Sequence, residues 1–127
     1  MQYIYSVAAL VVSASAFADT LAEERAFGEF AATGCQNHNG DLIIRGLVSG
    51  ANDDTVLLAD PTNPLSTTSV TLPGRAGDSR QATTQKLSEL RADRTSVVVT
   101  MQCEEGTPLA RHISYTDQDG RNGAITF

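Results

Sequence analysis

Residues 79–103, SRQATTQKLSELRADRTSVVVTMQC, carry the two patterns that decide the fold. The first half spaces alanine and leucine as one face of a helix, so it predicts a helix that Asp78 or Ser79 caps and that runs to about Arg91. In the second half, which starts at Thr95, every second residue from Val97 onward is apolar and most of the residues between them are polar, which is typical of a strand with one buried face. That buried face is predicted to carry Val97, Val99, Met101 and Cys103.

Shorter strand-like segments flank this helix and strand. Gly46, in the middle of the first of them, predicts a bulge or a strong bend. Pro61 to Pro64 is expected to break the chain after the second, because proline cannot donate to a strand ladder. In the segment after the long strand, Ile113 and Tyr115 are predicted to point inward, which turns His112 outward. These segments are 42–48, 55–60 and 69–72 before the helix, and 109–116 and 124–127 after the long strand.

A further helix is predicted at the start of the domain. Thr20 and Glu23 have the spacing of a capping box, in which two side chains satisfy free backbone N–H groups. Phe27 and Phe30 follow at helical spacing. We therefore expect a short helix over residues 21–33 whose aromatic pair faces the core.

The predicted order is helix, three strands, helix, two strands and a short final strand. A helix between the third and fourth strands of a five-stranded set is the layout of the OB-fold, a partly open Greek-key barrel. A bend at Gly46 suits the long, coiled first strand of such a barrel. The predicted fold class is therefore mainly β with one or two helices, as an OB-fold-like five-stranded Greek-key barrel. The alternative is another small α+β barrel or sandwich.

The first 18 residues, MQYIYSVAALVVSASAFA, have the pattern of a secretory signal peptide. Their apolar run is shorter than the roughly 20 residues that span a bilayer, and Ala16-Phe17-Ala18 is a small-x-small cleavage site. They lack the usual Lys or Arg, which leaves a buried N-terminal helix as the alternative. We expect cleavage after residue 18, one mature domain over 19–127, no membrane span, and a periplasmic or secreted location.

The charge composition narrows the classes of partner. The chain has 15 acidic and 9 basic residues and a net charge of −6, and every charged residue follows residue 18. Phosphate backbones repel such a chain, so nucleic acid is disfavoured as a partner. There is no Trp, and Tyr115 is the one Tyr after residue 18, so stacking platforms for bases or sugars are scarce.

Cys35 and Cys103 are the two cysteines of the chain. In an oxidising compartment a lone pair most often forms one disulfide, and the inward parity of Cys103 favours this pairing. The alternatives are free thiols and a metal site that adds His38 and His112. Cys103 and His112 lie nine positions apart, which is an unusual spacing for ligands. We predict a disulfide, with no metal and no other cofactor.

Three stretches together resemble the bacterial periplasmic OB-fold family: Ala22-Glu23-Glu24, residues 40–48 (GDLIIRGLV) and residues 53–60 (DDTVLLAD). The resemblance covers roughly residues 20–72. Members of that family are small and exported, and they begin with a helix before a strand of the form x-L-x-G-x-[IV]. The resemblance implies the fold and a stress-related binding role, and it implies no functional residue. The chain departs from the family in its two cysteines, its Pro-rich second loop and its extended helix region.

Three side chains are candidates for contact with a ligand or partner: Arg45, His38 and His112. Arg45 lies between Ile43 and Leu47 on the outer face of the first predicted strand, where a guanidinium can bind a partner. The alternative is an arginine whose stem covers apolar surface. His38 lies among amides in a loop, where an ordinary solvated histidine is the alternative.

Motifs for catalysis are missing from the sequence, which has no G-x-S-x-G, H-E-x-x-H, P-loop or C-x-x-C pattern. Asp117-x-Asp119-Gly-x-Asn122 superficially matches a calcium loop, but Arg121 takes the fifth position, so an ordinary turn is expected. We predict an exported, non-catalytic binding domain that recognises a small ligand or an envelope protein, with no catalytic residue. The alternatives are a disulfide-tied inhibitor or immunity-type protein, and a small enzyme or metal-binding protein.

Overall fold

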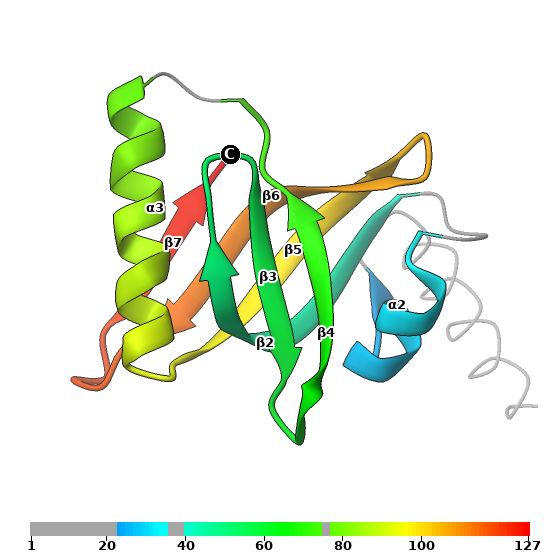
Figure 1. Ribbon diagram of the computed structural model, residues 1–127, viewed down its shortest axis with the longest axis horizontal. Coiled ribbons are helices and arrows are strands. Elements are labelled where there is room, and N and C mark those ends of the chain that lie inside the picture. The colour runs from blue at the N-terminus through cyan, green and yellow to red at the C-terminus, as the bar shows by residue number, and fades with distance from the viewer. Residues whose placement is uncertain (1–22, 36–39, 75–76) are drawn as a thin grey trace, which may run out of the picture.

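The computed structural model describes residues 23–35, 40–74 and 77–127, which form one mixed sheet with two helices (Figure 1). The predicted signal peptide and His38 lie outside these residues. The mainly β fold class is confirmed. The elements are β1 (Glu23–Glu24), α2 (Phe27–Thr33), β2 (Asp41–Ala51), β3 (Thr55–Asp60), β4 (Asn63–Thr71), α3 (Gly77–Ala92), β5 (Ser96–Glu104), β6 (Thr107–Thr116) and β7 (Asn122–Thr126).

The long strand β2 organises the sheet, because its two halves have different neighbours. Residues 41–47 pair antiparallel with β5, and residues 47–51 pair antiparallel with β3. The ribbon of β2 turns sharply between these halves (Figure 1). A Cβ on Gly46 would lie 3.2 Å from the Ala59 carbonyl oxygen and 3.2 Å from the Phe27 ring, so a side chain there would crowd β3 and α2. The predicted bend is confirmed, and the register shift lies further on, between Val48 and Gly50.

The strand pairings form a ring that starts and ends at β2. The order runs β2, β3, β4, β6, β5 and back to β2. All these pairs are antiparallel except β4 with β6, which are parallel and pair through Thr71 and Leu109. β7 extends the sheet beside β6, and β1 lies parallel to the start of β2. The final strand was predicted from the sequence, whereas β1 was not.

The two helices lie at opposite ends of the sheet (Figure 1), and the core combines side chains of the strands with those of both helices. The predicted inward faces are confirmed for β2 and β5, where Leu42, Ile44, Val97 and Val99 are fully buried. α3 contributes Leu87 and Leu90, as its periodicity predicted. It begins at Gly77, before either predicted cap residue, and Ala82, expected on the same apolar face, is exposed. Further buried apolar side chains of the same cluster are Phe27, Phe30, Val48, Val56, Leu58, Val70, Leu72, Met101, Ala110 and Ile113.

The predicted helix over residues 21–33 is wrong in its first half. Glu23 and Glu24 form β1, and α2 begins only at Phe27, with Ala26 at its N-cap and no capping side chain. The capping box therefore does not exist. Pairing with β2 overrides the local helical preference, and the Arg25 N–H continues it by donating to the Ile43 carbonyl (2.9 Å). The aromatic pair faces the core as predicted.

The predicted break at residues 61–64 is also wrong in part. Pro61 and Thr62 form the turn, but Pro64 lies inside β4, which begins at Asn63. Proline is tolerated there because the ladder is interrupted. Asp60 pairs with Asn63, and the next pair is Ala59 with Thr67, so the residues between them have no partner on β3.

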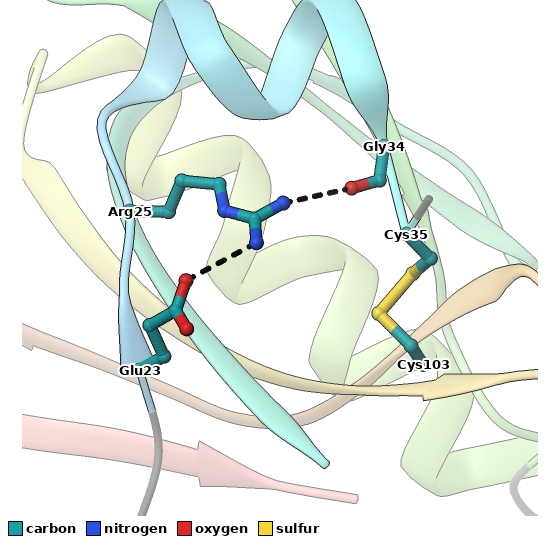
Figure 2. The surroundings of a disulfide bond; sticks show 5 residues. All are labelled: Glu23, Arg25, Gly34, Cys35 and Cys103. Atoms are coloured by element: carbon teal, nitrogen blue, oxygen red, sulfur yellow. Dashed lines mark hydrogen bonds and ion pairs between the residues drawn. A yellow bond between two sulfur atoms is a disulfide. The ribbon is translucent and has the colours of Figure 1, made fainter. Parts of the chain in front are cut away.

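The disulfide and a buried arginine fasten α2 to the rest of the fold. Cys35 follows α2 and is bonded to Cys103 near the end of β5, with 5.7 Å between the Cα atoms (Figure 2). This confirms the predicted pairing. Arg25, with a side chain only 10% exposed, donates from one terminal nitrogen to the Gly34 carbonyl (3.4 Å) and from the other to the Glu23 carboxylate (3.1 Å).

Candidate functional site

Two of the three predicted contact residues lie on one outward face of the sheet. Arg45 of β2 pairs with Val98 of β5, and Val98 pairs with Ser114 of β6. His112 lies one row away on β6, opposite Thr100 of β5. Strand spacing and rise place the Cα atoms of Arg45 and His112 about 12 Å apart. His38, the third candidate, lies outside the described residues.

We call this surface the contact face, and it spans four antiparallel strands. The residues alternate with the buried ones along each strand, so their side chains point away from the core. Most are hydroxyl-bearing or small and apolar, and Arg45 is their one permanent charge. The contact face comprises Ile43, Arg45 and Leu47 of β2, Ser96, Val98 and Thr100 of β5, His112, Ser114 and Thr116 of β6, and Asn122, Ala124 and Thr126 of β7.

A depression of about 590 Å³ occupies one end of the contact face. Arg45 lines it on one side, and the turn between α3 and β5 lines it on another. That turn brings in Arg94, whose backbone has a positive φ of 53°. A second depression of about 370 Å³ lies on the other side of Arg45, near β1 and Asp60. Arg45 therefore lines both hollows. The rest of the larger depression consists of Asp93, Thr95, Ser96, Val98, Ser114, Tyr115, Thr116, Asp117, Gln118, Asn122 and Gly123.

Arg45 is held only weakly in place. Its Nε lies 3.4 Å from Oε2 of Glu24, and the two side chains are 68% and 62% exposed. An ion pair this exposed contributes about 0–1 kcal/mol, because water screens both charges. The guanidinium can therefore leave Glu24 for a carboxylate on a partner at little cost.

His112 takes part in a contact between neighbouring strands. Its Nδ1 lies 3.3 Å from Oγ1 of Thr126 on β7, and its ring is half-buried on the contact face. The outward parity predicted for His112 is confirmed. The alternative metal site predicted from the sequence would combine His112 with Cys103. Cys103 is in the disulfide and cannot supply a thiolate.

The other polar patterns noted in the sequence serve the backbone. Oδ1 of Asp117 accepts N–H groups from Asp119 and Arg121, which makes the calcium-like segment an ordinary turn. Oδ1 of Asn52 likewise accepts the N–H groups of Asp54 and Thr55. No group of three or more potential metal ligands occurs within the part of the chain that the structure describes.

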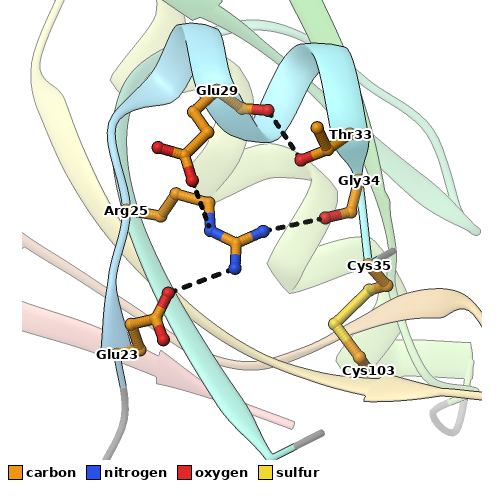
Figure 3. Close-up of polar contacts among 7 residues, drawn as sticks. All are labelled: Glu23, Arg25, Glu29, Thr33, Gly34, Cys35 and Cys103. Carbon is orange, nitrogen blue, oxygen red and sulfur yellow. Dashed lines mark hydrogen bonds and ion pairs between the residues drawn. A yellow bond between two sulfur atoms is a disulfide. The ribbon is translucent and has the colours of Figure 1, made fainter. Parts of the chain in front are cut away.

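Arg25 is the buried charge that the sequence did not single out. Figure 3 shows its guanidinium between Glu23, Glu29 and Gly34. Its Nε lies 3.4 Å from Oε1 of Glu29 but makes no well-aligned hydrogen bond. Thr33 Oγ1 in turn donates to the Glu29 carbonyl (2.8 Å). Every contact of this guanidinium is internal, so Arg25 fastens α2 and belongs to the scaffold.

One lysine has a perturbed environment behind the contact face. Lys86 of α3 lies 5.1 Å from the centroid of the Tyr115 ring. A hydrogen bond with Tyr115 raises the pKa of Lys86 above its ordinary value, and the Tyr115 charge adds to this effect. The pair links α3 to β6 next to Ser114 and Thr116. It therefore supports the strand that forms the middle of the contact face.

Comparison of the chain with protein-family models, curated proteins and solved structures finds no match. Among the helices of the described residues, none is long and apolar enough to cross a membrane.

Proposed function

We propose that this chain is an exported, non-catalytic binding domain that recognises an envelope or secreted protein through the contact face. The observation that carries the proposal is the position of Arg45 and His112. These two residues come from different strands, β2 and β6. They share one outward face with rows of hydroxyl groups and a depression of about 590 Å³. Such a face offers one releasable cation and many hydrogen-bonding groups to a partner.

Export is supported from two sides. The first 18 residues have the hydrophobic run and small-residue cleavage site of a signal peptide. The Cys35–Cys103 disulfide is consistent with an oxidising compartment, where such bonds form and persist.

The order of the strands supports an OB-fold-like barrel as the scaffold. The ring β2, β3, β4, β6, β5 has α3 between its third and fourth strands in chain order. The OB-fold has the same layout, and OB-folds commonly serve as binding scaffolds. This architecture also fits the resemblance of residues 20–72 to the bacterial periplasmic OB-fold family, which would make the binding role stress-related.

The chemistry of the depression favours a protein over a small apolar ligand. Pockets for small molecules are mainly apolar, with a few polar groups. Here most lining residues carry hydroxyl, amide or charged groups, although polar and apolar atoms share the lining surface about equally. The net charge of −6 disfavours nucleic acid. A protein that presents a carboxylate to Arg45 and hydrogen-bonding groups to the strands fits better.

Affinity capture from envelope extract of the producing organism tests the proposal. Arg45→Ala removes the cation, and Ser96→Arg places a bulky side chain in the depression. The matched control is Ser88→Arg, because Ser88 is exposed on α3, outside the contact face. We expect one stoichiometric partner with the wild-type chain and with Ser88→Arg. Both contact-face variants should capture at most about a tenth as much partner as the wild-type chain. A tenfold loss of affinity corresponds to roughly 1.4 kcal/mol of binding free energy.

Two outcomes would count against this function. If Ser96→Arg captures as much partner as Ser88→Arg, binding does not use the contact face. If the purified protein instead carries one zinc or copper ion per chain, the metal-binding alternative replaces it.

A further inference from the structure

The hairpin of β3 and β4 carries a three-residue bulge next to its turn. Between the pairs Asp60–Asn63 and Ala59–Thr67, β3 advances by one residue and β4 by four. Pro64, Leu65 and Ser66 therefore bulge out of the ladder. Bulges of this kind redirect side chains and are common beside functional sites. We call these residues the bulge segment.

Leu65 is the most exposed large apolar side chain among the described residues. It is 93% exposed, whereas Leu57 on the neighbouring strand β3 is 38% exposed. A leucine held this far from the core gains nothing from folding, because its apolar surface stays in water. Burial against a partner would recover that free energy.

Hydrogen bonds on its N-terminal side hold the bulge segment in shape. Oδ1 of Asn63 accepts the Leu65 N–H (3.3 Å), and Oδ1 of Asp60 accepts the Thr62 N–H and hydroxyl (both 2.9 Å). Pro64 fixes its own φ. Because the segment is ordered beforehand, it loses little conformational entropy when it binds.

Along the chain Leu65 is flanked by uncharged residues, and the nearest charge is Asp60 at the turn, whose carboxylate accepts the Thr62 N–H and hydroxyl. Residues 61–74 contain no Asp, Glu, Lys, Arg or His, and this is the longest such run after residue 18 in a chain of net charge −6. An apolar pocket can therefore receive Leu65 without desolvating a charged side chain of the same stretch of chain. A partner with an apolar pocket fits better than a membrane surface or an acidic ligand.

We propose that the bulge segment occupies the substrate cleft of a serine endopeptidase, with Leu65 in an apolar primary pocket, and thereby inhibits the enzyme. Such clefts bind short extended segments through main-chain hydrogen bonds and select one side chain in a pocket. The bulge segment is extended, lies within β4 and has no ladder partner on β3. The bond between Leu65 and Ser66 stays intact, since flanking pairs of the hairpin hold both sides. This inference does not depend on the contact face.

Inhibition assays with defined enzymes test it on the full chain. Chymotrypsin and subtilisin, whose pockets accept large apolar side chains, serve as probes, and trypsin, whose pocket holds a carboxylate, as the contrast. We expect the wild-type chain to inhibit at least one of the first two enzymes and not trypsin. Leu65→Asp should raise that inhibition constant about 30-fold or more, as for an interface hot spot. The matched control Leu57→Asp should change it less than about 3-fold, and Leu65→Arg should inhibit trypsin instead.

Several results would overturn the inference. The first would be that the wild-type chain inhibits neither chymotrypsin nor subtilisin, or that it is cut after Leu65 and released as an ordinary substrate. The second would be that Leu57→Asp weakens inhibition as much as Leu65→Asp, while both variants keep the wild-type circular dichroism and unfolding midpoint. The third would be a dimer in gel filtration that Leu65→Asp dissociates, because that result would assign Leu65 to self-association.

Discussion

At the residue scale, two arginines near the N-terminus show how environment decides a role. Arg45 is exposed, paired weakly with Glu24, and lines two depressions. Arg25 is 10% exposed and has carboxylate and carbonyl contacts inside the fold. The sequence indicated Arg45 because it stands between apolar residues of a strand. It offered no signal for Arg25, whose partners become neighbours only when α2 docks.

Replacement of Arg25 by methionine should lower stability, because its charged hydrogen bonds to Gly34 and Glu23 disappear. We expect a loss of about 1–3 kcal/mol in the free energy of unfolding, measured by urea denaturation. The matched control Arg45→Met, at an exposed pair, should change it by no more than about 0.5 kcal/mol. Equal effects of the two variants would contradict the scaffold role of Arg25.

Gly123 is expected to tolerate no side chain. It pairs directly with Tyr115, and an added Cβ would collide with the Tyr115 ring and hydroxyl. Gly123→Ala should lower stability by roughly 1–3 kcal/mol, the usual cost of overpacking. In the control Gly50→Ala the new Cβ meets only Leu57 Cβ at 3.9 Å, an ordinary contact, so stability should stay the same or rise slightly. Thermal unfolding of both variants checks this, and a neutral Gly123→Ala would show that the ring moves freely.

At the element scale, predictability followed the length of the pattern. α3 and β5 were predicted closely because each repeats its apolar period over several turns or residues against the core. β1 was missed because two residues carry no period, and only pairing with β2 makes them a strand. Pro64 predicts a break from the sequence alone, since the bulge that accommodates it depends on the β3–β4 register. His112 and Arg45 were placed on the outside by parity alone, but that they share one face needed the pairing order of the strands.

The turn between β5 and β6 offers a site where a substitution should raise the stability of the fold. Glu105 and Gly106 join the paired residues Glu104 and Thr107, and their φ angles are 52° and 81°. Two positive φ angles suit Asn-Gly, because asparagine adopts this conformation more readily than glutamate. Glu105→Asn should therefore raise the free energy of unfolding by about 0.5–1 kcal/mol. The control Glu104→Asn, in the strand itself, should give no gain, and a gain of equal size there would indicate a charge effect instead.

The disulfide should carry much of the stability of the α2 region. It closes a loop with a sequence separation of 68, for which chain entropy predicts roughly 4 kcal/mol. The double variant Cys35→Ala/Cys103→Ala should lose about that amount in urea unfolding. The wild-type chain in excess reductant should match it. A variant as stable as the oxidised wild-type chain would mean that the remaining contacts of α2 suffice.

At the scale of the whole molecule, scaffold and surface are separate. The ring of strands, the disulfide and Arg25 hold the shape, and none of them needs a partner. The contact face on β2, β5, β6 and β7 and the bulge segment on β4 belong to different elements, so they can be altered independently. We propose that the contact face is the surface through which this domain binds its protein partner.

Site-specific photo-crosslinking in cells of the producing organism tests whether the partner binds this face. A photoreactive residue replaces Ser96 in the contact face or Ser88 on α3, and adducts are identified by mass spectrometry. We predict one major adduct from position 96, reduced when Arg45→Ala is added, and none from position 88. Equal adducts from both positions, or an adduct from position 88 alone, would show that the partner does not bind through the contact face.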